Sequence, residues 1–201
     1  MRVSVTEIDA YRRWKADEEA ELEPLLRQLR KLDAPSEQML AGSALHKALE
    51  LATDGALFKV EQDGFKFVFD MNEEIALPVM REIKAEKVYM VGGQPVTLVG
   101  KVDALHGKRV EDHKTTGRFD AERFMDSYQW RAYLSIFAAD VFQWNVFEMG
   151  EQTEPRLYRV FAFHQFRQYR YAAMESDLMQ ALADFVGFAS VYLPERIAVA
   201  A

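Results

Sequence analysis

The segment GKVDALHGKRVEDHKTT, residues 100–116, decides how this chain folds. Each half of the segment contains a run of β-forming residues in partial alternation with polar ones, which is the pattern of a strand. Between the halves, His106 and Gly107 are suited to a tight turn. The segment is therefore predicted to form a β-hairpin with these two residues as its loop.

This hairpin is expected to bring two acids and a lysine to one face. With the turn at residues 106–107, Lys101 pairs with Asp112, and Asp103 and Asp112 become diagonal neighbours roughly 7–8 Å apart at the backbone. Lys114 follows on the same side because alternate residues of a strand share a face. Carboxylates that can hold a hard divalent cation, with an ammonium group beside them, suit phosphodiester hydrolysis. An isolated Asp-x-Lys is more often a solvated surface pair, so the rest of the chain has to support the catalytic interpretation.

The length and composition limit the class of protein. A chain of 201 residues is expected to form a single domain, residues 1–201. Without cysteine, this chain can form no disulfide, thiolate zinc site, cysteine nucleophile or cysteine-ligated iron–sulfur cluster. No apolar run is long enough to span a membrane, and residues 1–9 lack the layout of a secretory signal. The expected location is therefore the cytoplasm, with no membrane partner.

The net charge of −7 argues against a protein that coats nucleic acid non-specifically, because such proteins are basic. An active site rich in metal-binding carboxylates would itself lower the net charge, and bound metal ions would reverse the local sign. Basic residues also gather in the sequence near the central hairpin, among them Arg118, Arg123 and Arg131. The charge therefore leaves a nuclease open.

The remaining pattern predicts an α+β fold, a mixed α/β sandwich. Helical spacing with capping residues predicts helices early, in the middle and at the end of the chain, and alternation around Asp63-Gly64 and Gly92-Gly93 predicts hairpins. The predicted helices cover residues 4–32, where Pro24 separates two helices or begins the second, then 36–52, a helix that starts at Asp120 or Ser127 and runs through Asp140, and 169–191. The predicted strands cover 57–61, 65–69, 86–91, 95–105, 108–115, 142–149 and 156–165.

Two further residues are candidate metal ligands. His46 follows the small residues Gly42, Ser43 and Ala44 on a predicted helix, so another backbone could approach it, and neutral imidazole is a common ligand. The alternative is a histidine that packs or faces water. If Gly92-Gly93 is a two-residue turn, Glu86 pairs with Val99 and lies on the Asp103 side, as an additional ligand or as a surface charge.

Taken in chain order, these features resemble the PD-(D/E)xK nuclease superfamily in its RecB-like exonuclease branch. The helix with His46 looks like the histidine metal ligand of that branch. GKVD at 100–103 looks like its G-x-x-D strand, and DHK at 112–114 looks like its D/E-x-K motif. Gln129 and Tyr133 look like its Q-x-x-x-Y helix, and residues 4–14 resemble its first helix. The resemblance spans most of residues 1–140.

The resemblance implies a restriction-endonuclease-like core, in which helices flank a central mixed sheet containing an antiparallel meander. It also implies that His46, Asp103, Asp112 and the main-chain carbonyl of His113 bind one or two Mg²⁺ or Mn²⁺ ions. Lys114 would position or activate water. Asp103, Asp112 and Lys114 are thus the expected catalytic residues.

The resemblance further implies a hydrolase that acts on DNA ends or single strands. Gln129 and Tyr133 would contact the DNA backbone or organise the site, with Arg131 and Arg118 as additional candidates. Such an enzyme would be a phage-type or stand-alone exonuclease in recombination, repair or phage DNA processing, located in a bacterial or phage-infected cell. A recombination or repair protein is an expected partner, and oligomers are known among related exonucleases.

This sequence departs from the family pattern at several points. Val102 stands where the superfamily's proline would precede Asp103, and the second acid is Asp112, with Glu111 as the alternative if a bulge shifts the register. The cysteines of the iron–sulfur subgroup and a phosphate-binding helicase motif are both absent. Two other functions stay open: a catalytically inactive DNA-end- or protein-binding module of the same fold, and a nuclease that acts on RNA.

Overall fold

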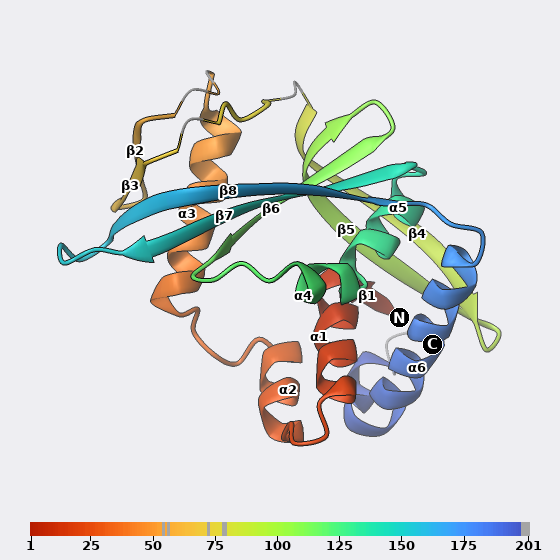
Figure 1. The fold of residues 1–201 in the computed structure, drawn as a ribbon. Helices are drawn as coiled ribbons and strands as arrows, with labels where there is room; N and C mark the ends of the chain where they lie inside the picture. Colours follow the sequence, from red (N-terminus) through yellow and green to blue (C-terminus); the bar gives the residue numbers. More distant parts are fainter. Residues whose placement is uncertain (54, 56, 72, 78–79, 198–201) are drawn as a thin grey trace.

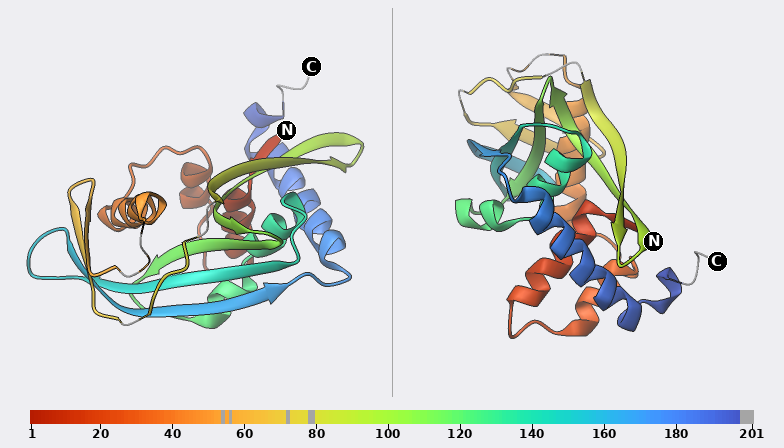
Figure 2. Two further views of the ribbon diagram at one scale, coloured as in Figure 1. Left: turned by 90° about the horizontal axis from the view of Figure 1, so that it is seen from above. Right: turned by 90° about the vertical axis from the view of Figure 1, so that its right-hand side faces the viewer.

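A mixed sheet of eight strands forms the centre of the protein, flanked by helices (Figure 1). The computed structural model describes residues 1–53, 55, 57–71, 73–77 and 80–197. The strand order is β1-β5-β6-β7-β8-β3-β2, and β4 pairs with β5. Figure 2 shows β8 along one border of the sheet and the β4–β5 hairpin at the opposite border. The predicted α+β class with a central mixed sheet is confirmed.

The elements follow in chain order as β1 (Arg2–Ser4), α1 (Val5–Ala16), α2 (Leu22–Leu29), α3 (Glu37–Leu51), β2 (Lys59–Gln62), β3 (Phe65–Phe69), β4 (Met80–Val91), β5 (Gln94–His106), β6 (Arg109–Thr116), α4 (Ala121–Asp126), α5 (Gln129–Ile136), β7 (Val141–Glu151), β8 (Leu157–Tyr169), α6 (Met174–Tyr192) and the 3-10 turn η1 (Pro194–Arg196).

The helix starts follow the local capping chemistry. The Ser4 hydroxyl accepts a hydrogen bond from Glu7 N–H, and the Glu7 carboxylate accepts one from Ser4 N–H, which is a capping box at the start of α1. Ser36 caps α3 by accepting from Met39 N–H. Pro24 lies in the first turn of α2. Backbone N–H groups in a first turn have no acceptor within the helix, so the lack of an N–H in proline costs no hydrogen bond there. The predicted break at Pro24 is thus the beginning of α2.

The central hairpin forms, but its turn is one residue later than predicted. His106 pairs with Arg109, so Gly107 and Lys108 form the loop. Gly107 has φ of +60°, a conformation that glycine adopts at the first loop position without steric cost. Continuing this register places Asp103 directly opposite Asp112 rather than diagonal to it. The two acids are still expected on a common face. Moving the turn by one residue shifts the partner of each residue by two positions, and residues two apart on a strand share a face.

Two other expectations are corrected, and one short strand is not among those predicted. Both predicted helix starts are used, because Asp120 caps α4 and Ser127 directly precedes Tyr128, the N-cap residue of α5, but they belong to two helices and the second ends at Ile136. The short strand β1, which pairs in parallel with β5, carries no alternation signal of its own. Strand β8 extends to Tyr169, four residues beyond the predicted end at residue 165, because β7 pairs with it throughout.

Two hydrophobic cores hold the helices against the sheet. The larger core joins α1, α2, α5 and α6 to β5, β6 and β7, and the smaller core joins α3 to β3, β7 and β8. The predicted turns at Asp63-Gly64 and Gly92-Gly93 are confirmed. Within the described ranges, no helix is both long and apolar enough to cross a lipid bilayer.

Gly100 is the point where α5 packs most closely on β5. A Cβ atom there would lie 2.8 Å from Cε1 of Tyr133 and 3.0 Å from Cδ1 of Ile136. Tyr133 is buried and stacked on Phe142 with ring centroids 5.9 Å apart, so its ring has little room to move. We therefore expect Gly100→Ala to lower the free energy of unfolding by about 1–3 kcal/mol, measured by urea denaturation.

Gly187→Ala is the matched control for this prediction. Gly187 lies on the exposed side of α6 with open space where its Cβ would be. Alanine there should raise the stability, by roughly 0.5–1 kcal/mol, because helix interiors favour alanine over glycine. Equal effects of the two changes would contradict the close packing at Gly100.

Candidate active site

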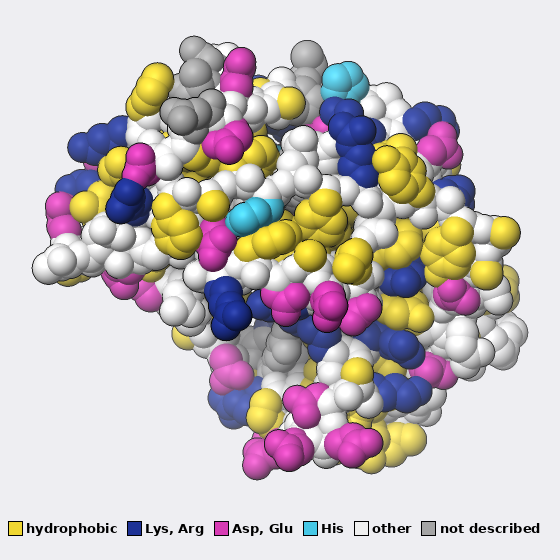
Figure 3. Space-filling view, viewed as in Figure 1, with side chains coloured by type: hydrophobic (Ala, Val, Ile, Leu, Met, Phe, Trp, Pro, Cys, Tyr) yellow, Lys and Arg dark blue, Asp and Glu magenta, His cyan; other side chains and the backbone are white. Residues whose placement is uncertain are grey.

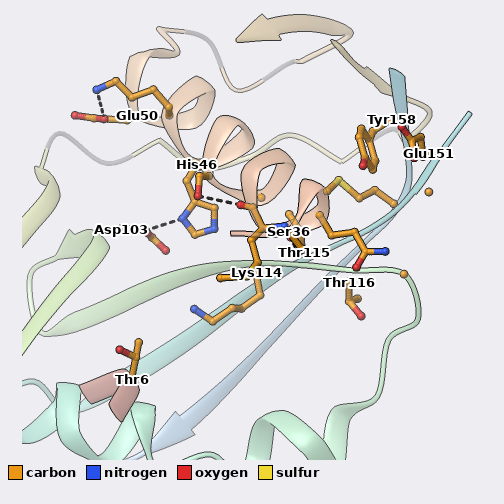
Figure 4. Close-up of a pocket in the computed structure, with 18 of the residues that line it drawn as sticks. Thr6, Ser36, His46, Glu50, Asp103, Lys114, Thr115, Thr116, Glu151 and Tyr158 are labelled. Atoms are coloured by element: carbon orange, nitrogen blue, oxygen red, sulfur yellow. Dashed lines mark hydrogen bonds and ion pairs between the residues drawn. The ribbon is translucent and has the colours of Figure 1, made fainter. Parts of the chain in front are cut away.

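The candidate site lies at a fork between β5 and β6. The two strands pair only from His106↔Arg109 to Ala104↔Glu111, and beyond that point β6 pairs with β7 while β5 pairs with β4. Helix α3 lies against β6 beside this fork (Figure 4). Its close approach needs Gly42, because a Cβ there would lie only 3.0 Å from Oγ1 of Thr115. The strands and α3 thus meet around the residues that follow the hairpin.

His46 and Asp103 connect α3 to β5 across the fork. Nδ1 of His46 lies 3.1 Å from Oδ1 of Asp103 (Figure 4). The other carboxylate oxygen, Oδ2, accepts a 2.6 Å hydrogen bond from the main-chain N–H of His113 on β6. One carboxylate therefore joins three elements, α3, β5 and β6.

These partners keep Asp103 ionised. Burial favours the neutral carboxyl, but the hydrogen bond and charge of His46, with His113 and Lys114 nearby, hold the pKa of Asp103 well below its usual range. The His113 imidazole is itself buried, and burial lowers its pKa to about 4. Its Nε2 has no hydrogen-bond partner among the described residues. At neutral pH, Asp103 is the charged member of this group and His113 is the neutral one.

Asp112 and Lys114 form an ion pair beside this group. Nζ of Lys114 lies 2.5 Å from Oδ2 of Asp112, although this oxygen has no aligned hydrogen bond among the described residues. Asp112 is only 3% exposed, and burial, with the charge of Asp103, raises its pKa to about 6 in spite of Lys114. Burial opposes the charge on Lys114, but Asp112 and Asp103 outweigh it and raise the pKa of Lys114. The lysine is therefore cationic throughout the physiological range.

The group opens onto a cleft of about 1150 Å³ lined by His46, Asp103 and Lys114, with Asp112 buried behind Lys114. Thr6, Lys114 and Arg123 also line a smaller hollow of about 270 Å³. The two hollows therefore adjoin along Lys114. The larger one has polar walls from α3 and from the end of β6, and an extended polar molecule could reach the candidate site through it.

Gln129 and Tyr133 of α5 lie close to this group but are buried. Gln129 is 6% exposed and lines the smaller hollow. Tyr133 is 4% exposed, and burial, followed by the charges of Asp112, Asp103 and Asp9, raises its pKa well above the usual value. In this arrangement Tyr133 supports the site from behind.

The other sequence candidates lie apart from the cleft. Glu86 pairs with Val99, as predicted from the Gly92-Gly93 turn, but its carboxylate forms an ion pair with Arg2 at 2.7 Å. The Arg131 guanidinium lies over the Trp130 ring and donates to the Tyr171 hydroxyl. Arg118 is exposed in the segment after β6 and lines neither hollow.

The alternative acid, Glu111, is placed on the opposite face of β6 from Asp112. It is fully buried, and its carboxylate accepts hydrogen bonds from Arg109 and Asn145. Strand alternation separates it from the Asp103 group, and no bulge interrupts the β5–β6 or β6–β7 pairing. Asp112 is therefore the acid that shares a side with Lys114.

Asp9 is a residue near the site that the sequence did not single out. It is 8% exposed on α1, and its Oδ1 accepts hydrogen bonds from the Ser127 hydroxyl and from Tyr128 N–H. It thus holds the two residues that precede α5, while the Gln129 N–H at the start of the helix donates to the Ser127 hydroxyl, and the charge of Asp9 also raises the pKa of Lys114. The available signal is an acid that interrupts the apolar face of a short helix.

The donor set suits a hard divalent cation. Imidazole nitrogen, two carboxylates and a main-chain carbonyl are ligands that Mg²⁺ or Mn²⁺ accepts, and Oδ2 of Asp112 is a buried acceptor without an aligned donor. Among the described residues, no three His, Asp or Glu side chains are already arranged around a common point. Asp103 uses its two oxygens for His46 and His113 instead. The residues fit such an ion chemically.

No family model matches this sequence, and no curated protein matches it. Solved structures do match the fold. The crystal structure of SSO0001 has 16% sequence identity and a TM-score of 0.56 over 93% of this chain and 76% of that one. The alkaline exonuclease LHK-Exo from Laribacter hongkongensis has 9% identity and a TM-score of 0.51 over 100% and 95% of the two chains. LHK-Exo in complex with dAMP has 10% identity and a TM-score of 0.52 over 99% and 94%. The chain thus has a fold that also occurs in a nuclease.

The two acids should titrate in opposite directions. In protein without added metal, we expect the Asp112 carboxyl to bind its proton at about pH 6 and Asp103 to stay ionised below the usual range. Because the folded protein holds the Asp112 proton more tightly than the unfolded chain, this group lowers stability as pH rises from about 4 through about 6. Carbon-13 NMR of the aspartate carboxyl carbons measures both values.

Lys114→Met should raise the pKa of Asp112 further, since the ammonium group stabilises its charged form. Lys101→Met is the matched control, because Lys101 pairs with Glu82 instead. It should leave the titration of Asp112 unchanged. An Asp112 that titrates at the value of a free aspartate would contradict the buried pair.

Proposed function

We propose that this chain is a metal-dependent deoxyribonuclease of the PD-(D/E)xK superfamily, in its RecB-like branch. One observation supports this function most strongly. His46, Asp103, Asp112 and Lys114, which come from three separate elements, meet at the wall of a polar cleft. The fold around them is also that of an alkaline exonuclease. If the acids of this hairpin were only solvated surface residues, Asp112 would be exposed and Asp103 would not be hydrogen-bonded to a histidine of another element.

Asp103 and Asp112, with His46 and the carbonyl of His113, would hold one or two Mg²⁺ or Mn²⁺ ions. The bound metal would polarise the scissile phosphate and supply a nucleophilic water at neutral pH. Asp112 is buried and the Asp103 side chain is only 14% exposed, so little bulk water surrounds their oxygens, which strengthens their attraction for a cation.

Lys114 acts through its positive charge. The neighbouring carboxylates keep it protonated, so it donates hydrogen bonds and does not serve as the base. Its ammonium group lines the cleft beside Asp112 and can orient water or stabilise the charge that develops on the phosphoryl oxygens. Asp9 and Gln129 support this position from the smaller hollow.

The substrate is DNA, cleaved from an end. The structural relative bound to dAMP supports this substrate, because dAMP has the form of a mononucleotide released from DNA. Such an exonuclease would act in recombination, repair or phage DNA processing. It would work alone or with a recombination partner protein. The α3 residues of the cleft are the expected backbone contacts, Arg118 lies outside the cleft, and Tyr133 holds α5 against β5.

A second function is a catalytically inactive module that binds DNA ends. The observation that favours it is the hydrogen-bonded state of Asp103, whose oxygens are both engaged. Such a module would bind single-stranded DNA without binding Mn²⁺. Titration calorimetry with Mn²⁺ separates the two functions.

The test of the nuclease is the cleavage of end-labelled single- and double-stranded DNA in the presence of Mn²⁺. We expect cleavage that EDTA abolishes. Asp112→Asn and Lys114→Met should each lower the rate on the order of 10²–10³-fold, because the first removes a carboxylate that would hold the metal and the second removes the ammonium charge that would stabilise the phosphoryl oxygens. Thermal unfolding should show that both variants stay folded.

Glu86→Gln is the control for this experiment, since Glu86 is half-exposed and paired with Arg2 away from the cleft. It should cleave at the rate of the unaltered protein. Normal cleavage by the Asp112 or Lys114 variant would contradict the assignment of these residues as catalytic. Cleavage of RNA but not of DNA would show that the substrate is RNA.

A further inference from the structure

Part of β8 is an unpaired edge of the sheet. Strand β7 pairs with β8 up to Tyr169, whereas β3 pairs only with residues 157–160. Among the residues that the structure describes, none pairs with residues 161–169 on the side away from β7. Figures 1 and 2 agree that this part of β8 is the outermost strand on its side of the molecule.

Alternate backbone groups of this segment are available to another strand. Arg170 N–H donates to Asp140 O at 3.0 Å, which continues the β7–β8 ladder by one pair. In antiparallel pairing, bonded positions alternate, so the even-numbered residues before Arg170 bond to β7. The N–H and C=O groups of Phe163, Gln165 and Arg167 therefore point to the free edge.

The side chains of this edge lack the devices that normally prevent pairing. Residues 161–169 read FAFHQFRQY, with no proline, lysine or acidic residue, and Arg167 is their only permanent charge. Native sheets usually protect long edges with such residues or with a bulge. Here one bulge lies at the start of the segment, and the side chains of Phe161 and Tyr169 are 44% and 60% exposed.

An acidic border runs along one face of the edge. Phe119 stacks on His164 with ring centroids 3.9 Å apart, and Phe124 of α4 packs on Phe166 at 6.1 Å. These contacts hold α4 beneath β8, where Asp120, Glu122 and Asp126 are exposed together with one basic residue, Arg123. Figure 3 looks onto this edge and shows a hydrophobic band above a row of acidic side chains over α4.

We propose that the free edge of β8 binds an extended segment of a partner protein as an additional strand. The backbone of residues 163–167 supplies the hydrogen bonds, as in other complexes formed by strand addition. The acidic border selects a segment with lysine or arginine at alternate positions, facing α4, and apolar residues on the other face. Charge complementarity favours such a partner over a second copy of this chain, because residues 161–169 carry no lysine and a single arginine, Arg167.

This surface is separate from the candidate active site. None of residues 161–169 lines the cleft or the smaller hollow. A strand docked on residues 163–167 would therefore not cover His46 or Lys114, although Arg123 and Phe124 of the neighbouring α4 line the hollows. The proposal does not rest on the nuclease function and can be tested whether or not the chain cleaves DNA.

The test measures peptide binding to the full chain by titration calorimetry. The probe is a capped peptide of alternating lysine and valine, matched in length to residues 161–169. A peptide of the same composition, with lysines in one block and valines in another, keeps the charge but cannot place it on one face. We expect the alternating peptide to bind at least about tenfold more tightly, and a glutamate–valine counterpart not to bind. Equal binding of the alternating and block peptides would overturn the proposal.

Gln165→Pro removes one outward N–H and leaves the backbone ladder to β7 in place, but it also removes the side-chain hydrogen bond from Nε2 to Asn145 of β7. Gln165→Thr removes the same side-chain bond and keeps the N–H, so the two variants differ in that N–H. We expect the proline variant to bind the alternating peptide about tenfold more weakly than the threonine variant. The surface variant Glu122→Lys with Asp126→Lys should weaken binding similarly, and it keeps the test valid if the proline variant fails to fold. Unchanged affinity of the charge variant for the alternating peptide would contradict the proposal that the edge binds a basic segment. So would a dimer of the unaltered chain that dissociates when Gln165 is changed to proline.

Discussion

The structure depends on one carboxylate that spans the opening between two strands. Where β5 and β6 separate, the main-chain N–H of His113 has no strand opposite it, and a buried N–H without an acceptor is costly. Asp103 accepts this hydrogen bond with one oxygen and bonds to His46 of α3 with the other. The same contacts that close the fork place an acid, an imidazole and the end of β6 together. The candidate site is thus a consequence of how the sheet divides.

The environments of the two acids give them different properties. Asp103 receives hydrogen bonds and faces positive charge, so it remains ionised, whereas Asp112 is buried with Asp103 close by and holds its proton to about pH 6. Lys114 lies between the cleft and Asp112 and is charged because of both. A divalent cation would relieve the repulsion between the carboxylates. Oδ2 of Asp112, which has no aligned hydrogen bond among the described residues, would then be a metal ligand.

The sequence predicts the local features well because their causes are local. Ser4 and Ser36 cap helices, Asp63-Gly64 and Gly92-Gly93 turn hairpins, and the common face of Asp103 and Asp112 follows from alternation. It predicts tertiary features poorly. The hydrogen bonds that join Ser127 and Tyr128 to Asp9 connect residues far apart in sequence, and the exposed edge of β8 depends on where β3 stops pairing. The predicted turn lies one residue before the observed one, because Gly107 could form a two-residue loop with the residue on either side of it.

The two proposed surfaces use different parts of the same sheet. The cleft forms where β6 loses β5 as a neighbour, and the docking edge forms where β8 loses β3. Anomalous diffraction from crystals soaked in Mn²⁺ tests the central claim most directly. The account predicts an Mn²⁺ peak bound by Asp103 and Asp112, with the His46 imidazole turned from Asp103 to the ion. A cleft without Mn²⁺, or an ion that touches neither carboxylate, would contradict it.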